Sequence, residues 1–192
     1  MTRCRTGSRP VVAAAVCGVA LLASACTTSA TATGTKGYIA GDGAVTIFDE
    51  AERQPAPRLA GESLGGEAIS LGDSAGRIAV VNIWAQWCAP CRAEADDLVE
   101  AARQLPDVTF LGVDIRDNRA AARAFVRSHG IPYDSLFDPG GSSLLAFHDV
   151  VTIQSPPTTL VIDEQGKVAA VVSGELTANT LIGLVDDVSA GG

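Results

Sequence analysis

The sequence has few positive charges. Its 192 residues contain 14 Lys and Arg against 22 Asp and Glu, which gives a net charge of −8 at neutral pH. Arg3, Arg5 and Arg9 precede Cys26 without any acidic residue, so a chain that begins at Cys26 has a net charge of −11. A domain this acidic repels polyphosphates and anionic lipid headgroups. We therefore expect no nucleic-acid partner and no electrostatic attachment to a membrane.

The sequence also lacks a hydrophobic run long enough for a comfortable membrane span. The apolar stretch Pro10–Ala25 follows basic residues and is shorter than the roughly 20 residues of a spanning helix. A short apolar stretch after basic residues is typical of secretory signal peptides. Leu21-Leu22-Ala23-Ser24-Ala25-Cys26 resembles the lipobox of bacterial lipoproteins, in which the cysteine is lipidated and becomes the new N-terminus. We therefore expect residues 1–25 to be a signal peptide, and lipidated Cys26 to anchor the protein at the outer face of the cytoplasmic membrane. An ordinary secretory signal and an uncleaved anchor are the alternatives, and all three place the domain outside the cytoplasm.

Cysteine is scarce in the part of the chain that follows the leader. Of the five cysteines, Cys4 and Cys17 lie in the leader and Cys26 is the expected lipidation site, which leaves only Cys88 and Cys91. Exported domains often use disulfides as structural cross-links. This chain keeps no further cysteine pair for that purpose.

The two remaining cysteines form the motif Trp87-Cys88-Ala89-Pro90-Cys91. The motif follows the apolar run Ile78–Trp84 and opens a stretch with helical patterning. At such a strand-to-helix turn, two thiols can form and release a disulfide with little backbone movement. A static cross-link is a weak alternative, because so small a loop contributes little stability in the loop-entropy model. A zinc site is another alternative, but it needs four ligands, and the two histidines, His129 and His148, are isolated. We therefore predict a redox-active disulfide, no metal and no separate cofactor.

The rest of the chain alternates between strand and helix patterns. Residues 27–35 are rich in small and polar residues, typical of a flexible tether, and a glycine turn within Tyr38–Phe48 predicts a small hairpin, so we assign both to residues 26–57. Residues 58–192 are enough for one domain with its own core. In it the patterns predict strands over 69–71, 78–84, 108–115, 134–138, 159–163 and 167–172, and helices over 89–105, 117–128, 142–147 and 177–189. This order predicts an α/β domain with a central mixed sheet flanked by two layers of helices.

Three segments carry recognisable motifs in a fixed order: Val81–Glu94 around the cysteines, Phe110–Asp114, and Pro157–Asp163. Together they resemble the thioredoxin fold and, more closely, the TlpA/ResA-like family of exported thiol–disulfide oxidoreductases. The resemblance covers about residues 58–188. It implies a thioredoxin-like domain with a βα insert in the middle and a short N-terminal β-hairpin extension.

Three residues on the predicted first helix are the candidate catalytic groups. Cys88 lies at the helix N-terminus, where free N–H groups and the helix dipole stabilise a thiolate, so we expect it to be the exposed nucleophile and Cys91, one turn on, the buried resolving thiol. Glu94 follows on the same helix face, where a buried carboxyl has a raised pKa and can exchange a proton with Cys91. The family places a Glu at this position, and an ordinary solvated acid is the alternative. Thioredoxins carry a buried Asp six residues before the first cysteine, but this chain has Asn82 there.

Prolines and a tryptophan are the candidate substrate-binding residues. Ala89-Pro90 resembles the Gly-Pro pair of reducing thioredoxins, at about −270 mV, more than the Pro-His pair of a strong oxidant near about −120 mV. Pro157 corresponds to the cis-proline that faces the motif in this fold. The residue before it normally offers its backbone to a substrate strand, but Pro156 has no N–H, which predicts a one-sided contact; Pro156 as the cis residue is the alternative. Trp87 flanks the site, with a place in the core as its alternative.

The resemblance implies an extracytoplasmic protein disulfide reductase. The implied substrate is the Cys-x-x-Cys-His disulfide of an apocytochrome c before haem attachment, the implied electron donor is a membrane dithiol protein, and we expect a monomer. A general or oxidising disulfide catalyst is the alternative within the same class. From another class, a copper-binding chaperone of the thioredoxin fold is the alternative, although such proteins use Cys-x-x-x-Cys with a distant His. A peroxidase is disfavoured because the chain has no Thr-x-x-Cys signature.

Overall fold

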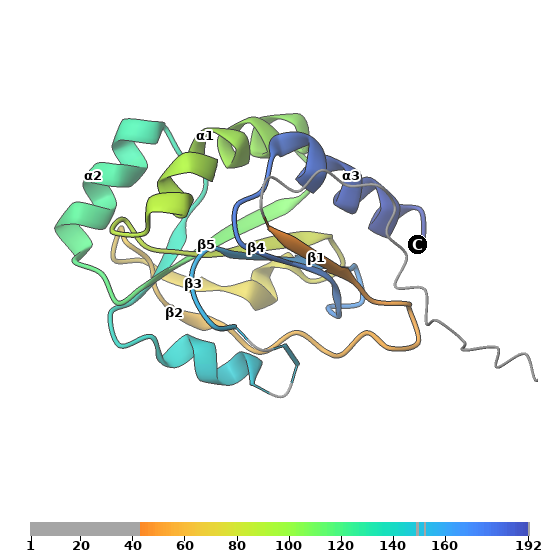
Figure 1. The fold of residues 1–192 in the computed structure, drawn as a ribbon. Helices are drawn as coiled ribbons and strands as arrows, with labels where there is room; N and C mark the ends of the chain where they lie inside the picture. The colour runs from red at the N-terminus through yellow and green to blue at the C-terminus, as the bar shows by residue number, and fades with distance from the viewer. Residues whose placement is uncertain (1–42, 149, 152, 192) are drawn as a thin grey trace, which may run out of the picture. The chain divides into compact units, whose positions relative to one another are not determined.

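The computed structural model describes residues 43–148, 150–151 and 153–191 (Figure 1). The predicted signal peptide, Cys26 and the tether lie outside these residues. The strands of the larger sheet are β1 (Ala44–Ile47), β4 (Ala79–Trp84), β5 (Thr109–Ile115), β6 (Ser135–Asp138), β7 (Thr158–Ile162) and β8 (Val168–Ser173), and those of a smaller sheet are β2 (Ala60–Glu62) and β3 (Ala68–Ser70). The helices are α1 (Ala89–Gln104), α2 (Arg119–His129) and α3 (Ala178–Ser189), and the 3₁₀ helices are η1 (Leu71–Ser74) and η2 (Ser142–Phe147).

The larger sheet has the order β1-β8-β7-β4-β5-β6. Strand β4 is central: it runs parallel to β5 and antiparallel to β7, and all six of its residues are buried. This confirms the prediction of a strand that is covered on both faces. Strand β6 extends the sheet beside β5, to which it is parallel, and leads into η2. These two elements are the predicted βα insert, and the short helix predicted over 142–147 is a 3₁₀ helix.

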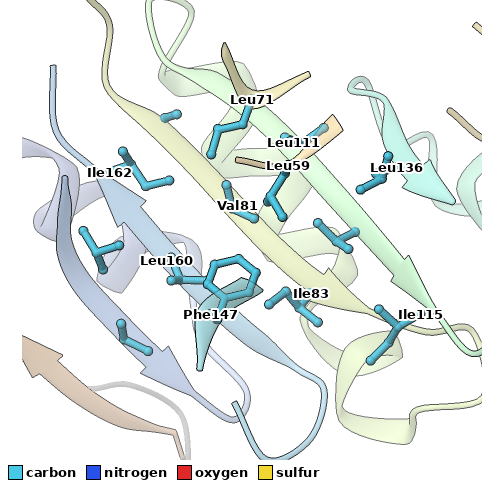
Figure 2. Close-up of a cluster of buried hydrophobic side chains, with 14 residues drawn as sticks. Leu59, Leu71, Val81, Ile83, Leu111, Ile115, Leu136, Phe147, Leu160 and Ile162 are labelled. Atoms are coloured by element: carbon cyan, nitrogen blue, oxygen red, sulfur yellow. The ribbon is translucent and has the colours of Figure 1, made fainter. Parts of the chain in front are cut away.

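The three α-helices lie over one face of the sheet, and the β2–β3 pair and the 3₁₀ helices lie over the other (Figure 1). The predicted helices are therefore found on both faces, but those on the second face are short 3₁₀ helices beside a hairpin. The crossovers β4–α1–β5 and β5–α2–β6 proceed in the same direction across the sheet, and right-handed crossovers in one direction place their helices on one face. The opposite face is closed instead by apolar side chains such as Leu59, Leu71 and Phe147, which pack on Val81 and Leu160 of the sheet (Figure 2).

The second half of the hairpin predicted within Tyr38–Phe48 is an edge strand of the larger sheet. Residues Ala44–Ile47 form the edge strand β1, which pairs antiparallel with β8, and residues 38–42 lie outside the described residues. The domain therefore begins before residue 58, and Gln54 also accepts a hydrogen bond at 2.9 Å from the backbone of Val168. A β-hairpin early in the described residues joins β2 to β3. Strand β2 has the sequence Ala-Gly-Glu and is exposed along its length, so it carries no apolar pattern that would have predicted it.

Candidate active site

The cysteine motif lies where β4 ends and α1 begins. Cys88 is the N-cap residue of α1, and its Sγ accepts a hydrogen bond at 3.2 Å from the backbone N–H of Cys91. The two cysteines form a disulfide, with their Cα atoms 5.3 Å apart. Pro90 lies in the first turn of the helix, where its missing N–H costs no helical hydrogen bond. The same N–H that caps the disulfide form is available to a Cys88 thiolate in the reduced form.

Both cysteines are buried in the disulfide form. Cys88 is 4% exposed and Cys91 is 3% exposed, so the expectation of an exposed Cys88 is wrong for this form. Both cysteines pack in an apolar cluster with Trp84 and Phe125. By contrast, Trp87 is 49% exposed, and its indole N–H donates to the carbonyl of Arg116 at 3.1 Å. A core position for Trp87 is thus ruled out.

Glu94 lies on the buried face of α1 with Cys91 and is fully buried. One carboxylate oxygen accepts a hydrogen bond from the Asn82 side chain at 3.0 Å, and the other accepts from the backbone N–H of Leu176 at 3.2 Å. Burial raises the pKa of Glu94 to about 8, and these two hydrogen bonds limit the rise. The prediction of a buried carboxyl with a raised pKa is confirmed, and a solvated acid is ruled out.

Asn82 connects Glu94 to the strand that follows the prolines. Its side-chain NH₂ also donates to the hydroxyl of Thr159 at 3.0 Å, so the amide bridges α1 and β7. The residue that replaces the buried Asp of thioredoxins therefore acts as a donor to the carboxyl on the helix. A neutral amide at this position leaves Glu94 as the titratable group of the network.

The peptide bond between Pro156 and Pro157 is cis. Pro157 is therefore the cis residue, as predicted, and the alternative assignment to Pro156 is wrong. The carbonyl of Pro157 accepts a hydrogen bond from the backbone of Gly174 at 3.0 Å. Pro156 is half-buried and has no N–H, so its own carbonyl is the backbone group that it can offer to a partner strand.

Comparison with known proteins places this site in a family. The model of the AhpC/TSA family matches residues 53–171. The chain belongs to this family. The thiol:disulfide interchange protein HelX of Rhodobacter capsulatus is 34% identical over 142 residues, which cover 71% of this chain and 75% of HelX. The thiol–disulfide oxidoreductase ResA of Bacillus subtilis is 27% identical over 132 residues, which cover 68% of this chain and 72% of ResA. The resemblance to TlpA/ResA-like proteins is thus confirmed, and this family member is a thiol–disulfide oxidoreductase.

Solved structures agree with this assignment. A DsbF homologue from Corynebacterium diphtheriae is 38% identical, with a TM-score of 0.70, over 77% of this chain and 94% of the homologue. A secreted thiol–disulfide isomerase from Corynebacterium glutamicum is 35% identical, with a TM-score of 0.65, over 78% of this chain and 96% of the isomerase. The domain of this family member therefore has the predicted thioredoxin-like fold.

The site also includes polar groups that the sequence patterns did not single out. The backbone N–H of Gln86 donates to the Asp117 carboxylate at 2.6 Å, and the Arg92 guanidinium donates to the Gln86 carbonyl at 2.8 Å. Asp114, at the end of β5, is fully buried. An acid within an apolar strand was a visible signal for Asp114, whereas nothing in the sequence indicated that the loop after β5 would contact the cysteine loop.

Two further findings concern the described residues alone. No group of three or more His, Cys, Asp or Glu among them is arranged to hold a metal ion. Within the same residues, the helices are all too short or too polar to span a bilayer.

Proposed function

We propose that this oxidoreductase reduces disulfides of exported proteins, and that its substrate is the Cys-x-x-Cys-His disulfide of an apocytochrome c before haem attachment. The observation that carries the proposal is the buried Glu94 on the same helix face as Cys91, with a pKa of about 8. A group with a pKa near the working pH can take up and return a proton in each cycle. The Ala89-Pro90 pair between the cysteines supports the reducing direction.

The reaction follows from the placement of these groups. The Cys88 thiolate attacks one sulfur of the substrate disulfide, that S–S bond breaks, and one substrate thiolate leaves. Glu94 then accepts the proton of the Cys91 thiol, and the Cys91 thiolate attacks Cys88 Sγ. The second substrate thiolate leaves, and the Cys88–Cys91 disulfide forms. Two electrons have passed from the enzyme to the substrate, and a membrane dithiol protein returns the enzyme to its reduced form.

Substrate binding uses the surface beside the disulfide. Trp87 is exposed next to Cys88 and offers an apolar face with a fixed orientation, because its N–H is bound to Arg116. Pro156 offers a carbonyl acceptor but no donor. A substrate strand therefore makes a one-sided backbone contact there, and the apolar contact with Trp87 contributes the remainder.

The protein works outside the cytoplasm as a monomer, held at the outer face of the cytoplasmic membrane by a lipid on Cys26. The leader-like residues 1–25 and the lipobox-like segment support this location. The net charge of −11 from Cys26 onward argues against a nucleic-acid partner and against attachment through anionic lipids.

A redox titration of the Cys88–Cys91 couple tests the direction of electron flow. A potential below about −230 mV would support the proposal of a reductant, whereas one near about −120 mV would favour the oxidising catalyst instead.

Trapping of mixed disulfides tests the substrate. In Cys91→Ser the mixed disulfide is not resolved, so the bound protein can be identified. The Cys88→Ser, Cys91→Ser double variant is the control, because it has no nucleophile. Failure of Cys91→Ser to trap any apocytochrome c would remove that substrate.

A further inference from the structure

Asp114 is a buried acid that the exchange reaction does not use. It lies one residue before the end of β5 and is fully buried. Neither of its carboxylate oxygens accepts a hydrogen bond from any described residue. A buried carboxylate without donors is strongly disfavoured, and such a group takes up a proton instead.

The surroundings of Asp114 are apolar on two sides. The sheet register places it beside Trp84 of β4 and Phe137 of β6. On the helix-covered side, the Arg119 guanidinium lies 4.2 Å from the centre of the Phe137 ring and pairs with Glu62 at 2.9 Å. Burial is the largest cause that raises the pKa of Asp114, to about 8. The negative charge of a second carboxyl, Asp117, is the next largest cause.

Asp117 has the opposite environment. One of its carboxylate oxygens accepts from the backbone N–H of Gln86 at 2.6 Å, and the other accepts from the backbone N–H of Asn118 at 2.6 Å. It directly precedes Asn118, the N-cap residue of α2, and a helix N-terminus favours a negative charge. Of two neighbouring carboxyls in such different environments, the buried one without hydrogen-bond donors keeps the proton.

A proton on Asp114 turns this residue into a donor. We propose that Asp114 is protonated at neutral pH, donates its O–H to the Asp117 carboxylate, and through Asp117 and Gln86 positions the loop that carries Cys88. The hydrogen bond gives a partner to the buried carboxyl, and it fixes the carboxylate that binds the Gln86 N–H. Asp114 is thus a positioning residue for the established thiol–disulfide exchange, whatever the substrate.

The loop that Asp114 supports is constrained from both sides. Arg116, between the two acids, has a left-handed backbone with φ of 51°, a conformation that residues other than glycine rarely adopt. Its carbonyl accepts from the Trp87 indole, and the Arg92 side chain binds the Gln86 carbonyl from α1. Because Trp87 and Gln86 directly precede Cys88, a change at the acid pair alters how the nucleophile is presented.

Carboxyl-carbon NMR of protein labelled with ¹³C at the aspartate side chains tests the protonation, because Glu94 is then silent. We expect one Asp signal to remain protonated at pH 7 and to titrate near pH 8. That signal should be missing in Asp114→Asn, should remain in Asp97→Asn, and should titrate at lower pH in Asp117→Asn, which removes the neighbouring charge. An Asp114 signal that titrates near pH 4 would overturn the proposal.

The rate at which reduced protein attacks 5,5′-dithiobis(2-nitrobenzoate) tests the positioning role. In Asp114→Leu the donor to Asp117 is lost, and we expect a rate roughly three- to tenfold lower. In Asp114→Asn the amide still donates, so the rate at pH 6.5 should stay within about twofold of the unmodified protein. The measurements are repeated in a Glu94→Gln background, since Glu94 also titrates near pH 8. Equal rates for Asp114→Leu and the unmodified protein, or an Asn variant as slow as the Leu variant, would refute the role.

Discussion

The two faces of the central sheet differ in chemistry. On the face covered by the hairpin and the 3₁₀ helices, apolar side chains form the cluster around Phe147 (Figure 2). The buried carboxyl beside η2, Asp138, accepts hydrogen bonds from Ser142 and Ser143. On the helix-covered face, the buried side chains near the active-site edge include Asn82, Glu94 and Asp114. One face therefore combines apolar contacts with an acid whose pKa is lowered by hydrogen bonds, whereas the other holds two acids whose pKa values are raised by burial. The predictions that follow test this division.

The largest expected effect is on the apolar face. Phe147 is fully buried, and Phe147→Ala should lower the free energy of unfolding by about 3–5 kcal/mol. The exchange rate per folded molecule should not change, because Phe147 packs on the face of β4 that carries Val81 and Ile83, opposite to the face that carries Asn82. Chemical denaturation and kinetics below the melting temperature measure both. Leu145→Ala on the same 3₁₀ helix is the control: Leu145 is 77% exposed, so its effect should stay within about 0.5 kcal/mol. A slower exchange rate in Phe147→Ala would contradict the division.

The second effect is on the pH dependence of stability. The folded-state pKa values of Glu94 and Asp114 are both raised to about 8, above the unfolded values near about 4. The folded state therefore binds more protons, so stability is highest below the unfolded pKa and declines as pH rises through about 8. We expect a decline on the order of 1 kcal/mol per pH unit between about pH 5 and pH 8. Urea denaturation at several pH values measures it, and Glu94→Gln should flatten the curve. Stability that is constant from pH 5 to pH 8 would show that neither acid is protonated.

The third effect concerns the proton exchange itself. Glu94→Gln keeps the shape of the side chain but removes its titration, so turnover at neutral pH should fall by at least about tenfold. The limb of the rate profile near pH 8 should disappear. Glu100→Gln is the matched control, because Glu100 is an exposed acid on the same helix. Unchanged kinetics across pH 6–9 would remove Glu94 from the mechanism.

The smallest effect should come from Pro156. Pro156→Ala restores a backbone N–H beside Pro157 and gives the substrate strand a second hydrogen bond. We expect KM for a peptide disulfide to fall by roughly two- to tenfold while kcat is unchanged. Ser155→Ala, one residue earlier, is the control. An equal KM in the two variants would mean that the substrate does not use this position.

The fold was largely predictable where the signal is local. The strand Ala79–Trp84 and the helix Ala89–Gln104 follow from an apolar run and a helical pattern that ends before Pro106. The pairing of strand Ala44–Ile47 with Val168–Ser173 was not predictable, because the two strands lie far apart along the chain. A local turn signal carries no information about such a partner.

The site was predictable to a similar degree. The three-residue spacing of Cys88, Cys91 and Glu94 placed them on the same face of a helix. The burial of Glu94 followed from its place on that face. The burial of Cys88 and the contact of Asp117 with Gln86 depend on how the loop after β5 approaches the loop after β4. That approach is a tertiary property, and no spacing in the sequence encodes it.

The register of β1 has a consequence for an anchored protein. Ala44 lies in one row of the sheet with Ser173, Thr158 and Ile83, three strand spacings, or about 14 Å, from the end of β4. The chain thus enters the domain at the edge that carries the disulfide. If Cys26 bears a lipid, the 16 residues 27–42 between it and Gly43 limit the distance from bilayer to domain to at most about 60 Å. With such an anchor, the tether would keep the disulfide within this distance of the bilayer, and a dithiol protein embedded in the same membrane would meet it at a high effective concentration.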